Sequence, residues 1–253
     1  MKKVAKKPKN TRVAKPEVTA PKLYKLTGAL GESIHGGSLT WSLPRGSTPG
    51  AWVEVTGEIR ACERGLHLVG AKHLLEWVKS GCRIFEVEAE GVIGDADTQT
   101  KVVASRVRLV REIENEKVGE ILVLRYGVHE VKSGIVLASG SSTVTASGSS
   151  TVTAYGSSMV RAYDSSTVRA YGSSMVRASG SSTVTAYDSS TVTASDSSTV
   201  TAYGSSTVRA IHKVVVVARW GSATVTLENA AVFVDQRGEK SVVMLAREME
   251  KGE

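Results

Sequence analysis

Residues 138–209 decide the fold, and they read ASGSSTVT, ASGSSTVT, AYGSSMVR, AYDSSTVR, AYGSSMVR, ASGSSTVT, AYDSSTVT, ASDSSTVT and AYGSSTVR. These nine octapeptides follow one another without insertion or deletion. Self-similarity at a fixed short period is typical of a solenoid, in which each repeat contacts only its neighbours. In each copy an alternation of polar and apolar residues ends at Gly-Ser-Ser or Asp-Ser-Ser, which predicts a short strand followed by a turn.

Two octads are predicted to form one coil. A strand advances about 3.3 Å per residue and facing sheets lie about 10 Å apart, so eight residues are too few to enclose a core. Methionine occurs only in odd octads, at Met159 and Met175, which supports a period of two octads. We therefore predict a parallel β-solenoid of two sheets, with about 16 residues per coil and about four and a half coils. The core should contain the alanine two positions after each octad valine, and the valine column Val144, Val152, Val160, Val168, Val176, Val184, Val192, Val200 and Val208.

The outward residues predict two unlike faces. One face carries a tyrosine column with arginine beside it, and the other is mostly threonine and serine. The tyrosine column has a second interpretation, because rings stacked one strand apart stabilise a ladder without any ligand. The candidate binding residues are Tyr155, Tyr171, Tyr187, Tyr203, Arg161, Arg177 and Arg209.

Composition divides the rest of the chain. Residues 22–115 contain short apolar strands and one stretch with helical spacing, residues 71–81, and they predict a small α+β domain. Residues 116–137 are expected to be a connector leading into the solenoid, which runs over 138–235 with degenerate coils at its end. Residues 236–253 are charged and are expected to cap the open solenoid end. The predicted fold class is mainly β: a small α+β N-terminal domain followed by a two-sheet parallel β-solenoid.

Two further expectations follow from local composition. The charged segment 112–119 is compatible with a helix. The bulky residues Trp220, Leu227 and Phe233 are expected to widen the core near the end of the solenoid.

The net charge of +7 is carried by the N-terminal end, because residues 1–22 hold eight Lys and Arg residues against one acid, Glu17. Proline and few bulky apolar residues make the tail, residues 1–21, a segment that we expect to be mobile in isolation. It is either an electrostatic anchor for nucleic acid or another acidic surface, or a solubilising leader or docking arm. The anchor residues would be Lys2, Lys3, Lys6, Lys7, Lys9, Arg12 and Lys15.

The hexapeptide Cys62-Glu63-Arg64-Gly65-Leu66-His67 gathers a nucleophile, an acid, a base and a cation. Because a histidine can activate a nearby cysteine, Cys62, Glu63 and His67 are candidate catalytic residues. The ordinary account is a turn around Gly65, with a half-buried Cys62 and with His67 hydrogen-bonded to backbone. The sequence contains no phosphate loop, metal-ligand cluster or nucleophile elbow, so we expect no enzymatic activity, no metal and no cofactor.

Targeting signals are not expected. Residues 1–22 lack the apolar core of a secretory signal, and no apolar run approaches the roughly 20 residues of a membrane span. Two cysteines, Cys62 and Cys82, fit a reducing compartment, although a disulfide between them is compatible with the sequence.

Two resemblances concern most of the chain. Residues 23–112, with their opening Leu-Tyr-Lys-Leu, the CERGLH turn and the strands IFEVEAEG and KVVASRVRLVRE, resemble a small uncharacterised domain encoded in actinobacteriophage genomes and some bacteria, where similar octapeptides often follow. This implies a phage or prophage origin, hence a location in the host cytoplasm or the virion, and no established activity. The octads are also similar to those of bacterial ice-nucleation proteins, which run close to Ala-Gly-Tyr-Gly-Ser-Thr-x-Thr. The chain departs from them by lacking the Gly before Tyr, by its arginines and by its shortness.

Three functions remain from these observations. The first is a structural or interaction protein with the solenoid as spacer or docking surface, the tail as anchor, and a protein partner or a second copy of itself. The second is a binder of ice or a carbohydrate polymer through the Thr/Ser ladder. The third is an enzyme that uses Cys62 and His67.

Overall fold

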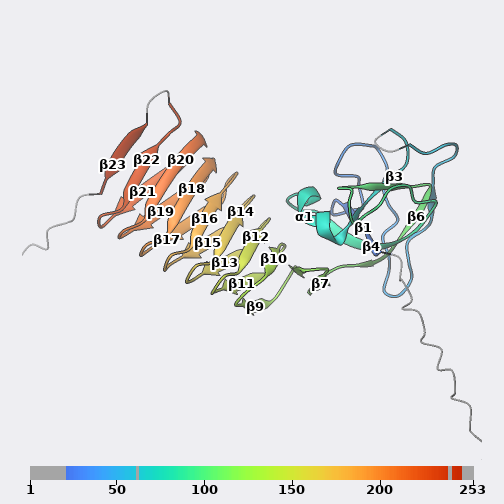
Figure 1. Ribbon diagram of the computed structural model, residues 1–253, viewed down its shortest axis with the longest axis horizontal. Helices are drawn as coiled ribbons and strands as arrows, with labels where there is room; N and C mark the ends of the chain where they lie inside the picture. Colours follow the sequence, from blue (N-terminus) through green and yellow to red (C-terminus); the bar gives the residue numbers. More distant parts are fainter. Residues whose placement is uncertain (1–20, 61–62, 239–240, 247–253) are drawn as a thin grey trace, which may run out of the picture.

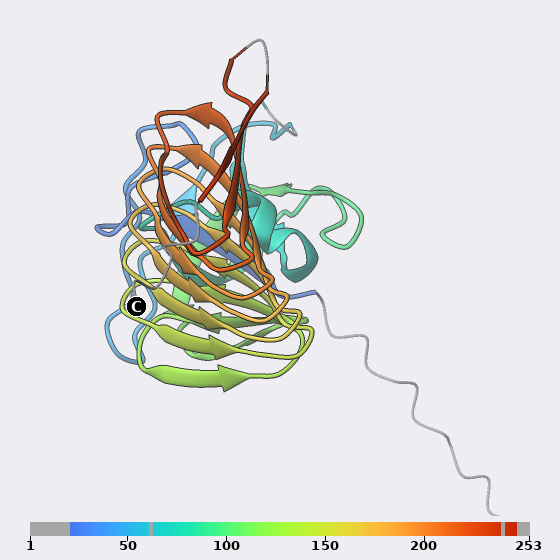
Figure 2. The same ribbon diagram turned by 90° about the vertical axis from the view of Figure 1, so that its left-hand side faces the viewer.

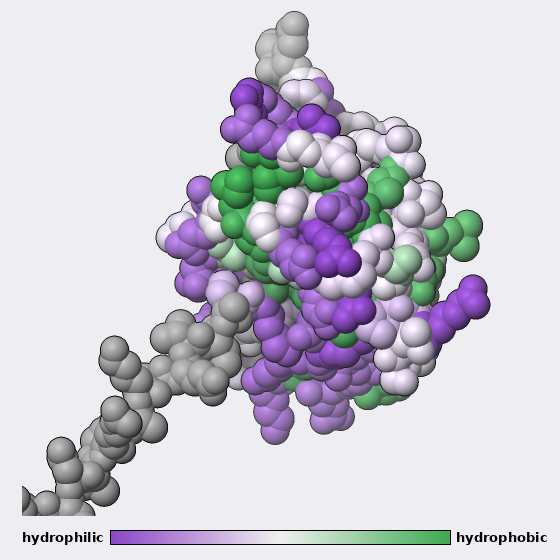
Figure 3. Space-filling view, turned by 90° about the vertical axis from the view of Figure 1, so that its right-hand side faces the viewer, coloured by the Kyte–Doolittle hydropathy of each residue, from purple (hydrophilic) through white to green (hydrophobic). Residues whose placement is uncertain are grey.

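The computed structural model describes residues 21–60, 63–238 and 241–246, which form a small N-terminal domain at one end of a long β-solenoid (Figure 1). The chain is mainly β, and about seven turns of about 16 residues stack along the solenoid. In the part of the chain that is described, no helix is both long and apolar enough to cross a membrane. Figure 3 views the domain end, where polar residues surround smaller apolar patches.

The N-terminal domain is built on one antiparallel sheet of six strands, in the order β2-β6-β4-β1-β3-β5. The alternation of its longest strands buries one side of the sheet around Phe85 and Leu109, which are both fully buried. The strands are β1 (Leu23–Thr27), β2 (Val53–Glu54), β3 (Leu66–Gly70), β4 (Arg83–Glu90), β5 (Val102–Ala104) and β6 (Arg106–Glu112).

The helical segment is shorter than predicted. It consists of a 3₁₀ turn, η1 (Ala71–His73), and one helical turn, α1 (Leu74–Trp77). Val78 already has an extended backbone, with φ −67° and ψ 135°. The chain leaves the helix here, and the side chains of Leu74 and Val78 both enter the same apolar cluster.

The solenoid is the two-sheet arrangement predicted from the octads. Figure 2, which looks along the rod from its C-terminal end, shows the coils stacked on one another with α1 beside them. The seven-stranded sheet contains β9 (Val128–Val131), β11 (Thr143–Ala146), β13 (Met159–Ala162), β15 (Met175–Ala178), β17 (Thr191–Ala194), β19 (Thr207–Ile211) and β21 (Thr224–Glu228), all parallel. The ten-stranded sheet contains β7 (Glu116–Val118), β8 (Ile121–Leu124), β10 (Ile135–Ala138), β12 (Thr151–Ala154), β14 (Thr167–Ala170), β16 (Thr183–Ala186), β18 (Thr199–Gly204), β20 (Val215–Gly221), β22 (Val232–Asp235) and β23 (Val242–Leu245).

The register confirms the period of two octads. Val144 pairs with Val160, and Val152 pairs with Val168, so equivalent residues in neighbouring coils are 16 positions apart. Every predicted core valine is buried, and so are the alanines two positions later. Small side chains suffice because identical layers stack in register and leave no large space to fill.

The chain turns at the third position of each octad, and this position is either Gly or Asp for the same conformational reason. Gly156, Asp164 and Asp188 have φ of 65°, 55° and 53°, the left-handed region that Gly and Asp tolerate best. Where Asp is present it adds a bond between coils, since Asp188 Oδ2 accepts the backbone N–H of Gly172 at 3.0 Å.

The solenoid is longer than predicted in both directions. β8 and β10 pair in parallel within the ten-stranded sheet, and β9 pairs with β11, so the expected connector 116–137 already contains coils. The segment 112–119, which the sequence made compatible with a helix, is not helical: Glu112 ends β6, and residues 116–118 form β7, which pairs antiparallel with β8. Its apolar Val118 is almost fully buried, which favours pairing onto the sheet.

The C-terminal end also differs from the prediction. Residues 242–245, placed in a charged cap, form β23, which pairs antiparallel with β22 and so extends the sheet. Phe233 is buried in the core and Leu227 is partly buried against it, as expected, but Trp220 is 74% exposed. A register shift between Ala202 and Tyr203 aligns Trp220 with Tyr203, at the outer edge of the coil.

A continuous apolar cluster joins the domain to the solenoid. This junction cluster includes Leu74 and Val78 from the domain together with Ile121, Leu137 and Tyr155 from the first coils. It covers the outer face of the ten-stranded sheet at its N-terminal end, because Ile121 and Leu137 point away from the solenoid core.

A polar network reinforces the same junction. Glu112, at the end of β6, forms ion pairs with Arg83 of the domain and with Arg125, which follows β8. The three side chains are largely buried, with exposed fractions of 16–25%. Asn115 adds a backbone clamp, since its Oδ1 accepts the N–H of Arg125 at 2.9 Å.

Candidate functional site

The hexapeptide 62–67 does not form a catalytic cluster among the residues that the structure describes. Cys62 lies outside them. Glu63 is exposed and lies 3.9 Å from Arg60 in an ion pair, while the His67 side chain lies on β3 and lines a cavity that Glu63 does not reach. We expected the His67 ring to form a hydrogen bond with the backbone. Its nitrogen Nε2 is buried but has no hydrogen-bond partner among the described residues.

Cys82 has a free thiol and is half-buried beside the junction cluster. Burial raises its pKa, which leaves the thiol protonated and weakly nucleophilic at neutral pH. Cys82 therefore packs as a small apolar residue.

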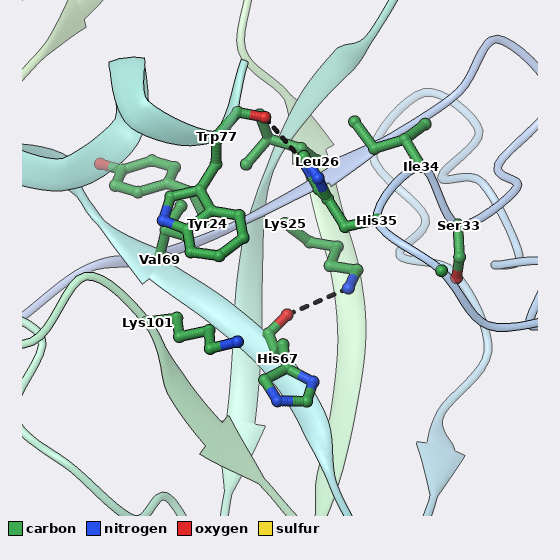
Figure 4. A pocket seen from close by; sticks show the side chains of 11 residues that line it. Tyr24, Lys25, Leu26, Ser33, Ile34, His35, His67, Val69, Trp77 and Lys101 are labelled. Carbon is green, nitrogen blue, oxygen red and sulfur yellow. Dashed lines mark hydrogen bonds between the residues drawn. The ribbon is translucent and has the colours of Figure 1, made fainter. Parts of the chain in front are cut away.

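The cavity that His67 lines has a volume of about 220 Å³ and lies in the N-terminal domain (Figure 4). Its lining residues come from β1, β3, α1, the loop after β1 and the residue before β5. We call it the basic cavity. It is lined by Tyr24, Lys25, Leu26, Ser33, Ile34, His35, Gly36, His67, Val69, Trp77 and Lys101.

Lys25 is the central cation of the basic cavity. Its Nζ donates a hydrogen bond to the His67 carbonyl oxygen at 3.0 Å and lies 5.1 Å from the centre of the Trp41 ring. Burial lowers the pKa of Lys25 from its ordinary 10.5 to about 8, because the apolar surroundings disfavour the charged form. The ammonium group is still mostly protonated at neutral pH.

Trp77 holds the other basic residues in place. His35 Nε2 lies 2.7 Å from the Trp77 carbonyl oxygen, and the two rings meet edge to face at 5.2 Å. Lys101 Nζ lies 5.2 Å from the centre of the Trp77 ring. The indole is itself fixed, since Trp77 Nε1 donates to the carbonyl oxygen of Thr100 at 2.8 Å.

The electrostatics of the basic cavity are one-sided. None of the described residues that line it is a carboxylate, and neither Lys25 nor Lys101 is ion-paired with a described carboxylate. The pKa of His67 is lowered by burial and then by Lys101 and Lys25, and that of His35 is lowered by burial and by nearby lysines. Such a site favours anions and repels metal ions.

The tyrosine column is a stack, as the ladder interpretation predicted. Neighbouring ring centroids of Tyr155, Tyr171, Tyr187 and Tyr203 are 4.8, 4.6 and 4.9 Å apart, with planes within 10° of parallel. The column begins inside the junction cluster, where burial raises the pKa of Tyr155, and becomes more exposed along the rod.

The tyrosines and three of the arginines do not share a face, contrary to expectation. Tyr155, Tyr171 and Tyr187 directly follow strands of the ten-stranded sheet, and Tyr203 lies near the end of β18 in the same sheet, so the column borders the threonine-rich face of that sheet. Arg161, Arg177 and Arg209 lie on the seven-stranded sheet. Half a coil separates the two sets, and consecutive strands belong to opposite sheets.

The seven-stranded sheet carries a patch of methionine and arginine. Met159 pairs with Met175, and Arg161 pairs with Arg177, in adjacent strands. Met175 and Arg177 are exposed, and no described carboxylate pairs with either arginine. Arg209 differs, because its Nε lies 2.7 Å from Glu228 in an ion pair. We call Met159, Arg161, Met175 and Arg177 the Met/Arg patch.

Sequence reasoning missed the basic cavity except for His67. Lys25, His35, Trp77 and Lys101 come from four separate segments, and no spacing links them. One signal was present: Lys25 lies in the middle of the apolar strand Leu23–Thr27. The tail lysines and Arg12 lie outside the described residues, so the anchor stays a prediction.

Comparisons with known proteins concern the N-terminal domain. Searches of curated proteins and of solved structures found no match. The matched segment of the chain begins after β1 and ends before β8, so it includes His67, Trp77 and Lys101 but not Lys25 or His35. Residues 39–120 match a family that is described as "Domain of unknown function (DUF7666)".

Proposed function

We propose that the protein is a non-enzymatic structural or interaction protein, with the β-solenoid as a rigid spacer and docking surface and the basic tail as an anchor. The junction carries this proposal. An apolar cluster and the Arg83–Glu112–Arg125 ion pairs hold the domain against the first coils, so the domain keeps a set orientation at one end of the rod. A rod with a fixed head suits a protein that spaces or positions other components.

The free outer face of the seven-stranded sheet is the best candidate for docking. The domain covers the opposite sheet, since the solenoid residues in the junction cluster come from the ten-stranded sheet and the tyrosine that borders it. Met and Arg are enriched at protein interfaces, and the Met/Arg patch combines both on a flat surface.

The charge of this patch indicates the partner. Arg161 and Arg177 are directly opposite each other on neighbouring strands, and like charges in that position destabilise a sheet. An acidic partner surface with an apolar spot for Met175 would remove this repulsion. The resemblance of residues 23–112 to a phage-encoded domain supports a phage component, located in the host cytoplasm or the virion.

The threonine ladder gives less support to an ice or polymer binder. Among the described strands of the ten-stranded sheet, β16 and β18 are the neighbours that both carry two outward threonines. Arg169 interrupts the ladder on β14, and Val215 and Val217 take the place of threonine on β20. Binding to a repetitive surface such as ice would need a longer uninterrupted run of threonines.

The test is the state of the protein in lysates of its source and in any particles purified from them. We expect an assembly of defined stoichiometry by size-exclusion chromatography with light scattering. The double charge reversal Arg161→Glu and Arg177→Glu should release the protein from it. Arg219→Glu is the matched control, because this arginine is exposed on β20 but lies outside the patch. A freely diffusing monomer at every stage would contradict the proposal.

A further inference from the structure

We propose that the basic cavity is a binding site for a small organic anion, a phosphate monoester or a carboxylate, whose acidic group is neutralised by Lys25 and Lys101. This site is independent of the docking role proposed for the solenoid. It lies in the N-terminal domain, and its residues come from β1, the following loop, β3, α1 and the segment before β5.

The first support is uncompensated charge. Figure 4 shows Lys25, from β1, and Lys101, from the segment before β5, extending into the same space, with His67 next to both. Lys101 lowers the pKa of both histidines, which places its charge within electrostatic range of each ring. Gathering cations without a described carboxylate is costly unless an anion joins them.

The second support is unused hydrogen-bonding capacity. Of its three donors, Lys25 Nζ uses one on the His67 carbonyl oxygen, the bond drawn in Figure 4. His67 Nε2 is buried and has no partner among the described residues. Buried polar atoms in native proteins nearly always have a hydrogen-bond partner, so this unpartnered nitrogen beside the lysines fits a site that binds an acidic group.

The third support is the size and the mixed lining of the cavity. A volume of about 220 Å³ accommodates an acidic group with a small apolar substituent, but not a polymer. Ile34, Val69 and the indole of Trp77 supply apolar walls beside the lysines. The hydrogen bonds of Trp77 to His35 and Thr100 hold that wall in position.

The experiment is calorimetric titration of the full chain with phenyl phosphate, with inorganic phosphate and benzoate as further anionic probes. The anilinium ion has a similar apolar ring but the opposite charge. We expect saturable one-to-one binding of phenyl phosphate, weaker binding of inorganic phosphate and no binding of the anilinium ion. Lys25→Met and Lys101→Met should each weaken phenyl phosphate binding at least tenfold.

Lys117→Met is the matched control, because Lys117 is exposed on β7 and does not line the cavity. It should bind phenyl phosphate as the unmodified chain does. Circular dichroism and thermal melting check that each variant is folded, and Lys101→Met, which changes another lining residue, stands in if Lys25→Met does not fold. Equal affinities in all variants, equal binding of the anilinium ion, or no saturable binding of any anionic probe would overturn the proposal.

Discussion

The N-terminal domain has a core of large, dissimilar side chains such as Phe85, Leu68 and Leu109, whereas the core enclosed by the regular coils consists of Val and Ala beside a row of buried Ser. In the domain each residue fills a space of its own, so its loss leaves a cavity. In the solenoid neighbouring coils bury equivalent residues, so the stability of the solenoid is close to a sum of similar contributions from the coils and the interfaces between them. The domain is therefore sensitive to single substitutions, and the solenoid to changes of period.

The largest expected effect is a core truncation in the domain. Phe85→Ala should lower the free energy of unfolding of the domain by about 3–5 kcal/mol, because the fully buried ring leaves a cavity. Val184→Ala, in the middle of the solenoid, should cost about 2 kcal/mol, since it removes two methyl groups. Urea unfolding measures both, and equal costs would contradict the contrast between the two cores.

The second prediction concerns the tyrosine column, which belongs to both regions. Tyr155→Ala should cost about 3 kcal/mol, because its ring is 8% exposed and packs in the junction cluster. Tyr187→Ala removes only stacking contacts on a partly exposed ring and should cost about 1–2 kcal/mol. Thermal melting followed by circular dichroism gives the order; a larger loss for Tyr187→Ala would show that the stack, and not the junction, dominates.

The third prediction separates stability from binding in the basic cavity. Lys25→Met should raise the free energy of unfolding at pH 7 by about 1–3 kcal/mol, since the folded chain no longer buries an ammonium group. Its folded pKa of about 8 is below the ordinary 10.5, so between these values the unfolded chain binds more protons. The stability of the unmodified protein should therefore rise with pH from about 8 to 10.5, relative to the variant.

Urea unfolding at several pH values measures this difference. His35, His67 and Lys101 face the same cavity and are unchanged in the variant, so the comparison isolates Lys25. A difference between the two proteins that stays constant from pH 7 to 10.5 would show that the ammonium group is not disfavoured in the folded state.

The smallest expected effect tests the period of the solenoid. Deleting residues 171–186 removes one full coil and keeps every later strand in its sheet, with Tyr187 stacked on Tyr155. Deleting residues 187–194 removes half a coil and Tyr187, sends later strands to the opposite sheet and leaves Tyr203 without a tyrosine to stack on. Although shorter, the second deletion should cost about 1 kcal/mol more, roughly one stacked pair.

Near-ultraviolet circular dichroism reports the tyrosine stack in both deletions. The signal should persist after removal of residues 171–186, which leaves two stacked pairs, and fall after removal of residues 187–194, which leaves only Tyr155 on Tyr171. Equal signals and equal melting temperatures in the two proteins would mean that the period of two octads does not matter for stability.

The octads by themselves determined the solenoid, its two sheets, its period and its column of buried valines. This was possible because a stacked coil contacts only its neighbours, so the pattern that specifies it is local. Because the prediction depended on the local octad pattern, it was wrong at both ends of the solenoid. Residues 121–137 form coils although they lack the octad pattern, and Trp220 lies outside the core because a register shift displaces it.

Only the tertiary structure decided which face of the rod is free and where the basic cavity lies. The domain covers the ten-stranded sheet through residues on α1 and β8 that no sequence pattern links. Lys25 and Lys101 line the same cavity, although 76 positions separate them, because antiparallel pairing places β1 next to β3 and β3 next to β5. Contacts between distant segments depend on how whole elements pack, and the local pattern of residues does not encode that packing in a readable form.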